Sequence, residues 1–129
     1  MSARAVLTGQ DGRVFVFDDQ GHHVLPGGRR TGTESVLEAL AREIREEVGC
    51  DIVGEPQPLG FFELRNDGAR PEGDPYPYPR NYHVVFKASA GPVTQAPVDP
   101  NVHDGRFVSR DEALALDIPW AERVFLEAM

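Results

Sequence analysis

The sequence has one cysteine, no surplus of basic charge and no long apolar run, and each of these absences excludes a class of protein. Cys50 has no partner for a disulfide within the chain, so we expect it to be a small core residue. A formal net charge of −8 excludes binding of a long nucleic acid through a broad basic face. A small anion held by a bound metal and a few arginines remains compatible with this charge.

Features that would direct the chain to a membrane are also lacking. No apolar stretch approaches the ~20 residues needed to span a bilayer. The first residues, Met1–Ala5, lead directly into a predicted strand rather than a signal peptide. We therefore expect a cytoplasmic protein that has no membrane partner.

The length and the order of predicted elements indicate the fold class. A chain of 129 residues can bury one hydrophobic core, and with no internal repeat we expect one domain over residues 1–129. Strands wrapped around helices from the middle and end of the chain predict an α/β sandwich with a mixed sheet. The expected strands are Ala3–Thr8 and Arg13–Phe17 as a hairpin, His22–Leu25, two pieces within Asp51–Leu64, Tyr82–Ala88 and Gly105–Val108; helices are expected over Val36–Val48 and Asp111–Leu116, and from Pro119 onward.

Three carboxylates lie at helical spacing near the end of the central predicted helix. Glu43, Glu46 and Glu47 stand at i, i+3 and i+4, so they project from one side of the helix. They repel one another and also lie near the negative end of the helix macrodipole, just before Gly49. Closely spaced oxygen ligands suit Mg²⁺ or Mn²⁺, which would reverse this repulsion. The alternative is a solvated charged face, since Glu is a good helix former.

The residues around these carboxylates form a longer pattern. From Gly28 to Cys50 the chain reads G-x5-E-x7-R-E-U-x-E-E-x-G-U, where U is a bulky apolar residue, and every specified position is matched. This pattern resembles the Nudix box, the signature of the Nudix hydrolase family. The resemblance implies a Nudix-type α/β/α sandwich with a mixed β-sheet. It also implies hydrolysis of a phosphoanhydride bond in a nucleoside triphosphate, or in a nucleoside diphosphate linked to another group, with Mg²⁺ or Mn²⁺ as cofactor.

The resemblance also implies roles for individual residues. Glu46 and Glu47 are implied metal ligands, Glu43 a ligand or the general base, and the Gly27 carbonyl a further ligand. Arg42 is implied to orient a carboxylate beside the metal, although a surface ion pair with a glutamate one turn away is the alternative. Glu34 is implied to pair with this arginine or to assist metal binding, but it is also a favourable acid at the positive end of the helix. A further ligand from a later loop is frequent in the family, and the candidates are Asp99, His103 and Asp104.

A proline-rich loop over residues 66–80 is the candidate substrate contact. Tyrosine and arginine side chains cluster in or beside it, and such planes stack on a nucleobase or hold phosphate. Packing of the tyrosines is the alternative. The candidate substrate-binding residues are Arg65, Arg80, Tyr76, Tyr78 and Tyr82.

The sequence therefore predicts a metal-dependent nucleotide pyrophosphohydrolase whose partner is a small nucleotide. Two other classes remain open: a Nudix-like domain that binds nucleotide as a sensor without turnover, and an acidic module that docks on a basic protein. The resemblance adds a homodimer as one candidate state, since dimers are common in the family, and the individual nucleotide is not readable from the sequence.

Overall fold

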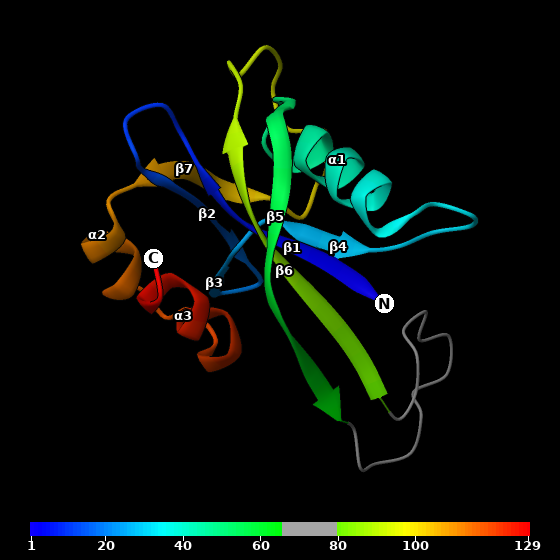
Figure 1. Ribbon diagram of the computed structural model, residues 1–129. Helices are drawn as coiled ribbons and strands as arrows, with labels where there is room; N and C mark the ends of the chain where they lie inside the picture. The colour runs from blue at the N-terminus through cyan, green and yellow to red at the C-terminus, as the bar shows by residue number, and fades with distance from the viewer. Residues whose placement is uncertain (66–79) are drawn as a thin grey trace.

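A computed structural model describes residues 1–65 and 80–129, which form a twisted mixed sheet with helices on both sides (Figure 1). Residues 66–79 of the predicted proline-rich loop lie outside the described residues, and Arg80, expected at its end, is the first residue of a strand. The strands are β1 (Ser2–Thr8), β2 (Val14–Asp19), β3 (His22–Val24), β4 (Gly27–Arg29), β5 (Ile52–Arg65), β6 (Arg80–Ala90) and β7 (His103–Val108); the helices are α1 (Val36–Glu47), α2 (Arg110–Leu114) and α3 (Trp120–Glu127). None of the described helices combines the length and the apolar character needed to cross a bilayer.

The strand order is β3-β2-β1-β6-β5, with β4 paired to β1 and β7 paired to β2. Strand β1 runs parallel to β6, and the other pairs are antiparallel, which confirms the mixed sheet. The expected hairpin between the first two strands is reduced to one pair, Thr8 opposite Val14. One edge of β1 is paired along its whole length with β6, and β4 takes the beginning of the other edge. Most of the strands were therefore predicted, but β4 was not expected, and the main pairing of β1 is non-local.

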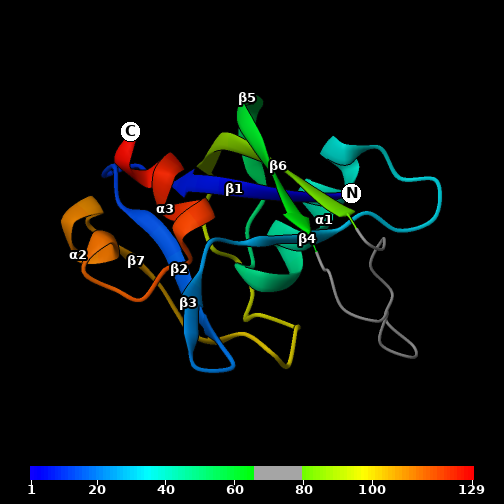
Figure 2. The same cartoon turned by 90° about the horizontal axis from the view of Figure 1, so that it is seen from below.

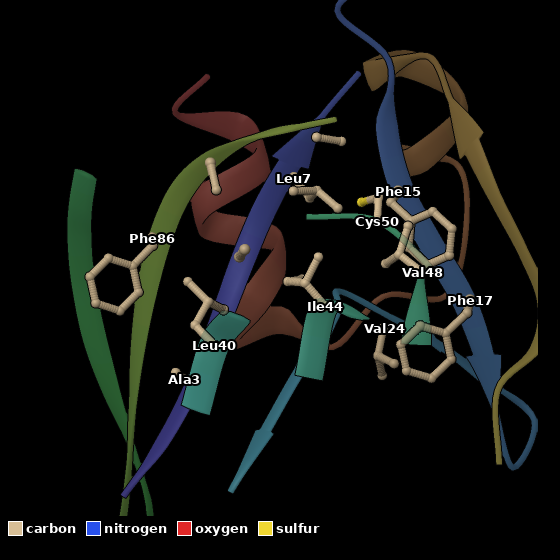
Figure 3. Packing of buried hydrophobic residues seen from close by; sticks show 13 residues of the cluster. Ala3, Leu7, Phe15, Phe17, Val24, Leu40, Ile44, Val48, Cys50 and Phe86 are labelled. Atoms are coloured by element: carbon tan, nitrogen blue, oxygen red, sulfur yellow. The ribbon is translucent and has the colours of Figure 1, made fainter. Parts of the chain in front are cut away.

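Each face of the sheet carries its own hydrophobic core. Side chains alternate along β1, so that Leu7 joins Leu40 and Ile44 of α1, whereas Val6 joins Leu126 of α3. Figure 3 shows the core beneath α1, and Figure 2 shows α3 and α1 on opposite sides of β1. The sandwich expected from the sequence is confirmed. Cys50 is 2% exposed and belongs to the α1 core, as predicted.

Helix α1 begins as its sequence predicts. The Ser35 side chain accepts a hydrogen bond from the Glu38 N–H, and the Glu38 side chain accepts one from the Ser35 N–H. The two bonds form a capping box. The buried face of α1 includes Ala39 and Glu47, whereas the apolar Leu37 is 42% exposed. The helix is therefore rotated so that Glu47 faces the sheet.

Strand β5 is continuous where two pieces were expected. Its pairing with β6 is irregular between Val53 and Gln57 and again between Pro58 and Gly60. The irregularities accommodate two prolines in a strand at the end of the sheet, which is where proline is tolerated. In Figure 1, β5 and β6 extend together beyond the other strands.

Candidate metal and phosphate site

The approach of α1 to β4 depends on two glycines. Gly27 has φ of +144°, and a Cβ at this position would lie 2.1 Å from the Ala3 carbonyl oxygen of β1. A Cβ on Gly28 would lie 2.6 Å from the Glu43 carboxylate. The Gly27 N–H donates a 2.7 Å hydrogen bond to Glu47 Oε1. The absence of side chains at Gly27 and Gly28 therefore lets two carboxylates of α1 reach the strand directly.

An acidic cluster forms where α1, β4 and a later loop meet. Oxygen atoms of Glu43, Glu47 and Asp99 all lie within 4.8 Å of one another. The Glu47 side chain is the most enclosed, since this residue is 4% exposed. Three hard oxygen donors at this spacing, from two turns of a helix and a docked loop, fit a site for Mg²⁺ or Mn²⁺.

The electrostatics of the cluster favour a bound cation. Burial raises the pKa of Glu47 to about 9, and the Glu43 and Asp99 carboxylates add to the rise, whereas the Gly27 hydrogen bond and Arg4 oppose it. Burial also raises the pKa of Glu43, with Arg42 opposing and Glu46 and Asp99 contributing. Without a cation, these carboxyl groups keep their protons to a higher pH than exposed carboxyl groups do. A divalent cation would replace the protons and stabilise the ionised forms.

The loop that carries Asp99 is bonded to the C-terminal end of α1. The N–H groups of Val98 and Asp99 donate to the Glu46 carbonyl, at 2.9 and 3.3 Å, and the Thr94 N–H donates to the Gly49 carbonyl at 2.9 Å. These bonds satisfy carbonyl groups that a helix end leaves without intrahelical partners. The loop thus places Asp99 beside residues that are about fifty positions away in the sequence.

The other two candidates for the later ligand lie elsewhere. His103 stands at the start of β7, opposite Asp18 of β2. Asp104 is bound to Arg106 at 2.7 Å. Of the three candidates, the structure brings only Asp99 into the acidic cluster.

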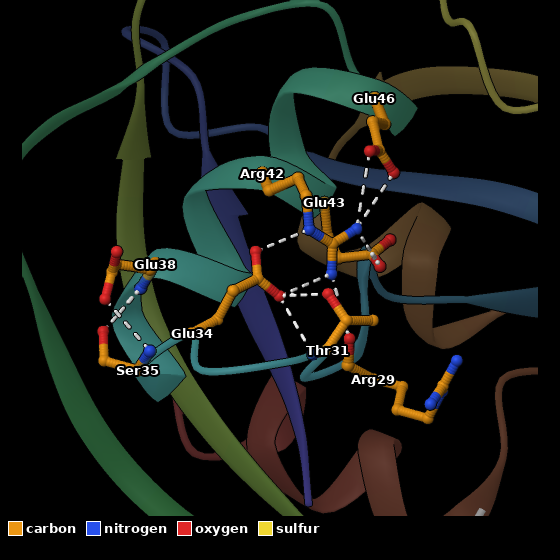
Figure 4. Close-up of polar contacts among 8 residues, drawn as sticks. All are labelled: Arg29, Thr31, Glu34, Ser35, Glu38, Arg42, Glu43 and Glu46. Carbon is orange, nitrogen blue, oxygen red and sulfur yellow. Dashed lines mark hydrogen bonds and ion pairs between the residues drawn. The ribbon is translucent and has the colours of Figure 1, made fainter. Parts of the chain in front are cut away.

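Arg42 links the carboxylates of α1 to the segment that precedes the helix (Figure 4). Its Nε donates to Glu34 Oε2 at 2.8 Å, and its Nη1 donates to Glu43 Oε1 at 3.0 Å and to Glu46 Oε2 at 3.3 Å. Its Nη2 donates to the Arg29 carbonyl at 3.0 Å. These hydrogen bonds raise the pKa of Arg42, and the bond to Glu34 is the largest cause. In turn, the hydrogen bonds that Glu34 accepts from Arg42 and from the Thr31 side chain and N–H lower the pKa of Glu34 to about 2. The guanidinium group of Arg42 is therefore held in place by its hydrogen bonds, as an orienting role requires.

Of the two glutamates one turn away from this arginine, Glu46 pairs with it at 3.3 Å, whereas Glu38 is used in the capping box. Glu46 is the least enclosed of the three helical carboxylates, with 38% of its side chain exposed, and it is held against Arg42 outside the acidic cluster.

A cleft of about 480 Å³ opens over the acidic cluster. Its walls include cationic and amide side chains that were not singled out from the sequence, namely Arg4, Arg29 and Asn101. Arg29 directly follows the two glycines of β4, and this position was the one sequence feature that could have identified it as a residue of the cleft. Arg4 comes from the alternation of β1, and Asn101 from the same loop as Asp99. The cleft thus places three guanidinium groups and four carboxylates around one space, those of Arg4, Arg29 and Arg42 and those of Asp19, Glu43, Glu47 and Asp99.

The candidate substrate-binding residues that the structure describes lie apart from this cleft. Arg65 and Arg80 face each other at the far ends of β5 and β6, and Arg80 Nε lies 3.4 Å from Glu63 Oε1. Tyr82 lines a separate apolar hollow of about 490 Å³ together with Phe61. Within residues 1–65 and 80–129, none of these side chains lines the acidic cleft. Tyr76 and Tyr78 lie outside the described residues.

Comparison with known proteins places the chain in a family. It is 44% identical over 50 residues to the 8-oxo-dGDP phosphatase NUDT18 of Danio rerio, a match that covers 39% of this chain and 14% of that protein. A NUDIX hydrolase from Nitrosomonas europaea superposes with a TM-score of 0.76 at 17% identity, covering 98% of this chain and 84% of that one. The E. coli dihydroneopterin triphosphate pyrophosphohydrolase superposes with a TM-score of 0.70 at 19% identity, covering 99% of this chain and 92% of that one.

These structural likenesses show a shared fold, and the short match with NUDT18 spans about one seventh of that protein. The model of the NUDIX domain matches residues 1–129. The chain therefore belongs to the NUDIX domain family.

Proposed function

We propose that residues 1–129 act as one catalytic domain that hydrolyses a phosphoanhydride bond in a nucleotide or nucleotide derivative, with Mg²⁺ or Mn²⁺ as cofactor. The observation that carries this proposal is the convergence of Glu43, Glu47 and Asp99 in a cleft that Arg4 and Arg29 also line. Cleavage of a phosphoanhydride requires neutralisation of phosphoryl oxygens and activation of water. The cleft contains groups suited to both tasks.

Glu43, Glu47 and Asp99 would hold the cation, and the Gly27 carbonyl is a further candidate ligand beside them. When bound, a divalent cation lowers the pKa of water and neutralises negative charge on phosphoryl oxygens. Glu46 remains a candidate ligand by its place in the Nudix box. Glu43, which lines the cleft, remains a candidate for the general base as well as for a ligand.

The positive side chains of the cleft would bind the phosphate groups. A guanidinium group donates in a planar fork that matches phosphate oxygens, and Arg4 and Arg29 both line the cleft beside the carboxylates. Arg42 is already bonded to four acceptor groups, so its role would be to hold Glu43 and Glu46 rather than to contact substrate.

The substrate class follows from this division of the cleft. A metal site beside two arginines suits a chain of two or three phosphates, and the net charge of −8 disfavours a long polyanion. The names of two similar proteins, an 8-oxo-dGDP phosphatase and a dihydroneopterin triphosphate pyrophosphohydrolase, support a small heterocyclic di- or triphosphate.

The test is release of phosphate or pyrophosphate from a panel of nucleoside di- and triphosphates and nucleotide sugars, with Mg²⁺ and with Mn²⁺. We expect turnover that chelation abolishes and that Glu47→Gln reduces by at least about a hundredfold, because the ionised ligand is lost. Glu55→Gln, at an exposed position of β5, is the matched control.

Two outcomes would contradict the proposal. Tight nucleotide binding without turnover across the panel would indicate a sensor domain. A thermal midpoint that neither cation shifts, in the parent protein or in Glu47→Gln, would indicate an acidic interaction module.

A further inference from the structure

One buried carboxylate lies outside the acidic cluster and has no part in the proposed chemistry. Glu122, in the first turn of α3, is 5% exposed. Its Oε1 accepts a 2.8 Å hydrogen bond from the Leu25 N–H. Arg4 attracts this carboxylate and Asp19 repels it. Because an enclosed carboxylate is costly to hold, its retention at this position calls for an explanation in terms of what it binds.

Glu122 binds the beginning of a short segment, Leu25–Gly27, that ends at the metal site. The Leu25 carbonyl accepts a 2.9 Å bond from Arg4 Nη1, so the N–H and the carbonyl of this residue are both held by charged side chains. The Pro26 carbonyl accepts from the Ala5 N–H at 2.9 Å. At the other end, the Gly27 N–H donates to Glu47. The segment therefore connects α3 to the carboxylate at the centre of the acidic cluster.

The segment has little freedom to adjust. Gly27 lies so close to β1 that a Cβ would meet the Ala3 carbonyl at 2.1 Å, and Pro26 has a fixed φ and no N–H. Displacement of Leu25 is therefore transmitted along the backbone to Gly27 instead of being absorbed between them. Loss of the Glu122 contact would leave the Leu25 N–H without its partner in a buried place and would release this end of the segment.

We infer that Glu122 is a positioning residue for the metal site: by binding the Leu25 N–H it fixes the segment Leu25–Gly27, and through the Gly27 N–H it fixes Glu47. This inference rests on the proposed function, in that the cluster around Glu47 binds a cation. It couples α3 to a site whose two helical carboxylates come from α1, in the first half of the chain.

The test compares Glu122→Leu, which removes the acceptor, with Glu122→Gln, which retains an acceptor oxygen. Glu127→Leu, at an exposed position of the same helix, is the matched control. Mn²⁺ affinity is measured on the protein without substrate, from the electron paramagnetic resonance signal of the unbound Mn²⁺. We expect Glu122→Leu to weaken Mn²⁺ binding about tenfold or more, as loss of an indirect ligand contact commonly does. Glu122→Gln and Glu127→Leu should stay within about threefold of the parent protein.

A second readout needs neither metal nor turnover. Amide hydrogen exchange at Leu25 and Gly27 in the metal-free protein should accelerate in Glu122→Leu and stay near the parent rate in Glu122→Gln. Should Glu122→Leu fail to fold, Glu122→Asp serves instead, because its shorter side chain keeps the charge but loses the reach. Here too we expect faster exchange at Gly27 and weaker Mn²⁺ binding.

The outcomes separate this inference from the proposed function. A folded Glu122→Leu or Glu122→Asp variant with parental Mn²⁺ affinity and parental exchange at Gly27 would overturn the positioning role, whether or not the protein is an enzyme. A parent protein that binds Mn²⁺ and responds to these variants, yet cleaves no phosphoanhydride, would refute the enzymatic proposal and support the positioning role. Failure of the parent protein to bind Mn²⁺ would overturn both.

Discussion

Replacement of Glu47 by glutamine should stabilise the metal-free protein at neutral pH. The pKa of this carboxyl is raised from 4.5 in the unfolded chain to about 9 in the folded one. Folding at pH 7 therefore takes up a proton, and at ~1.4 kcal/mol for each unit of pH above 4.5 this uptake costs about 3 kcal/mol. Glutamine needs no proton, and its side-chain oxygen can still accept the hydrogen bond from Gly27.

The sign of the effect can be followed across the pH range. Because the folded state binds the proton more tightly, the contribution of Glu47 is fully present below pH 4.5 and is lost as the pH rises toward 9. The advantage of Glu47→Gln over the parent protein should therefore be near zero at pH 4.5 and grow to about 3 kcal/mol at pH 7. Excess Mg²⁺ should reverse the order, since a cation at about 1,000 times its Kd stabilises the parent protein by about 4.1 kcal/mol.

Urea denaturation in chelator at pH 5, 7 and 8.5, repeated with Mg²⁺, measures these differences. The control Glu55→Gln, at an exposed position, should track the parent protein under all conditions. A Glu47→Gln protein that is less stable than the parent at pH 7 in chelator would refute the reasoning. A difference that stays the same from pH 5 to pH 8.5 would refute it as well.

Four further substitutions test three separate parts of the structure. Arg42→Lys should lower kcat/KM at least about tenfold and reduce the free energy of unfolding in urea by about 1–3 kcal/mol, because one ammonium group cannot replace a guanidinium bonded to four acceptors. Parental values for both quantities would contradict an orienting role for Arg42. Gly28→Ala should weaken Mn²⁺ binding with little loss of stability, since its Cβ would meet the movable Glu43 carboxylate, whereas Gly27→Ala should destabilise the fold by more than about 2 kcal/mol by meeting a backbone oxygen; equal effects on stability would be inconsistent with this contrast. Burial lowers the pKa of His83 from 6.5 to about 4, so the parent protein should lose up to ~1.4 kcal/mol for each pH unit between these values and His83→Phe should lose less, as acid denaturation curves would show; parallel curves would exclude this role.

The parts of the fold and site that could be predicted are those governed by local sequence. The capping box at Ser35, the helix that follows it and the position of its carboxylates depend on residues a few places apart. Strand β4 was not expected, because two of its three residues are glycine, which is uncommon in strands. The three carboxylates nevertheless differ in the structure, because the helix face is rotated so that Glu47 is buried while Glu46 is partly exposed. Helical spacing alone does not give this rotation, which depends on the sheet.

The parts that could not be predicted depend on contacts between distant segments. Asp99 was one of three candidates, and it joins the cluster only because its loop docks on the end of α1. Arg4 was not singled out, since its place in the cleft requires β1 to lie between β6 and β4. The expected hairpin is reduced to one pair because β4 takes the beginning of the same edge of β1, and local turn signals do not predict this pairing.

The docking of residues 94–99 on the end of α1 determines where the connection between β6 and β7 can tolerate inserted residues. Thr94, Val98 and Asp99 take their positions from carbonyl groups of the helix, not from the span between β6 and β7. Insertions between Ala90 and Thr94 would therefore bulge outward and leave the aspartate in register. A single residue inserted between Val98 and Asp99 would shift it by one step, so tolerance to insertion should change abruptly within this one connection.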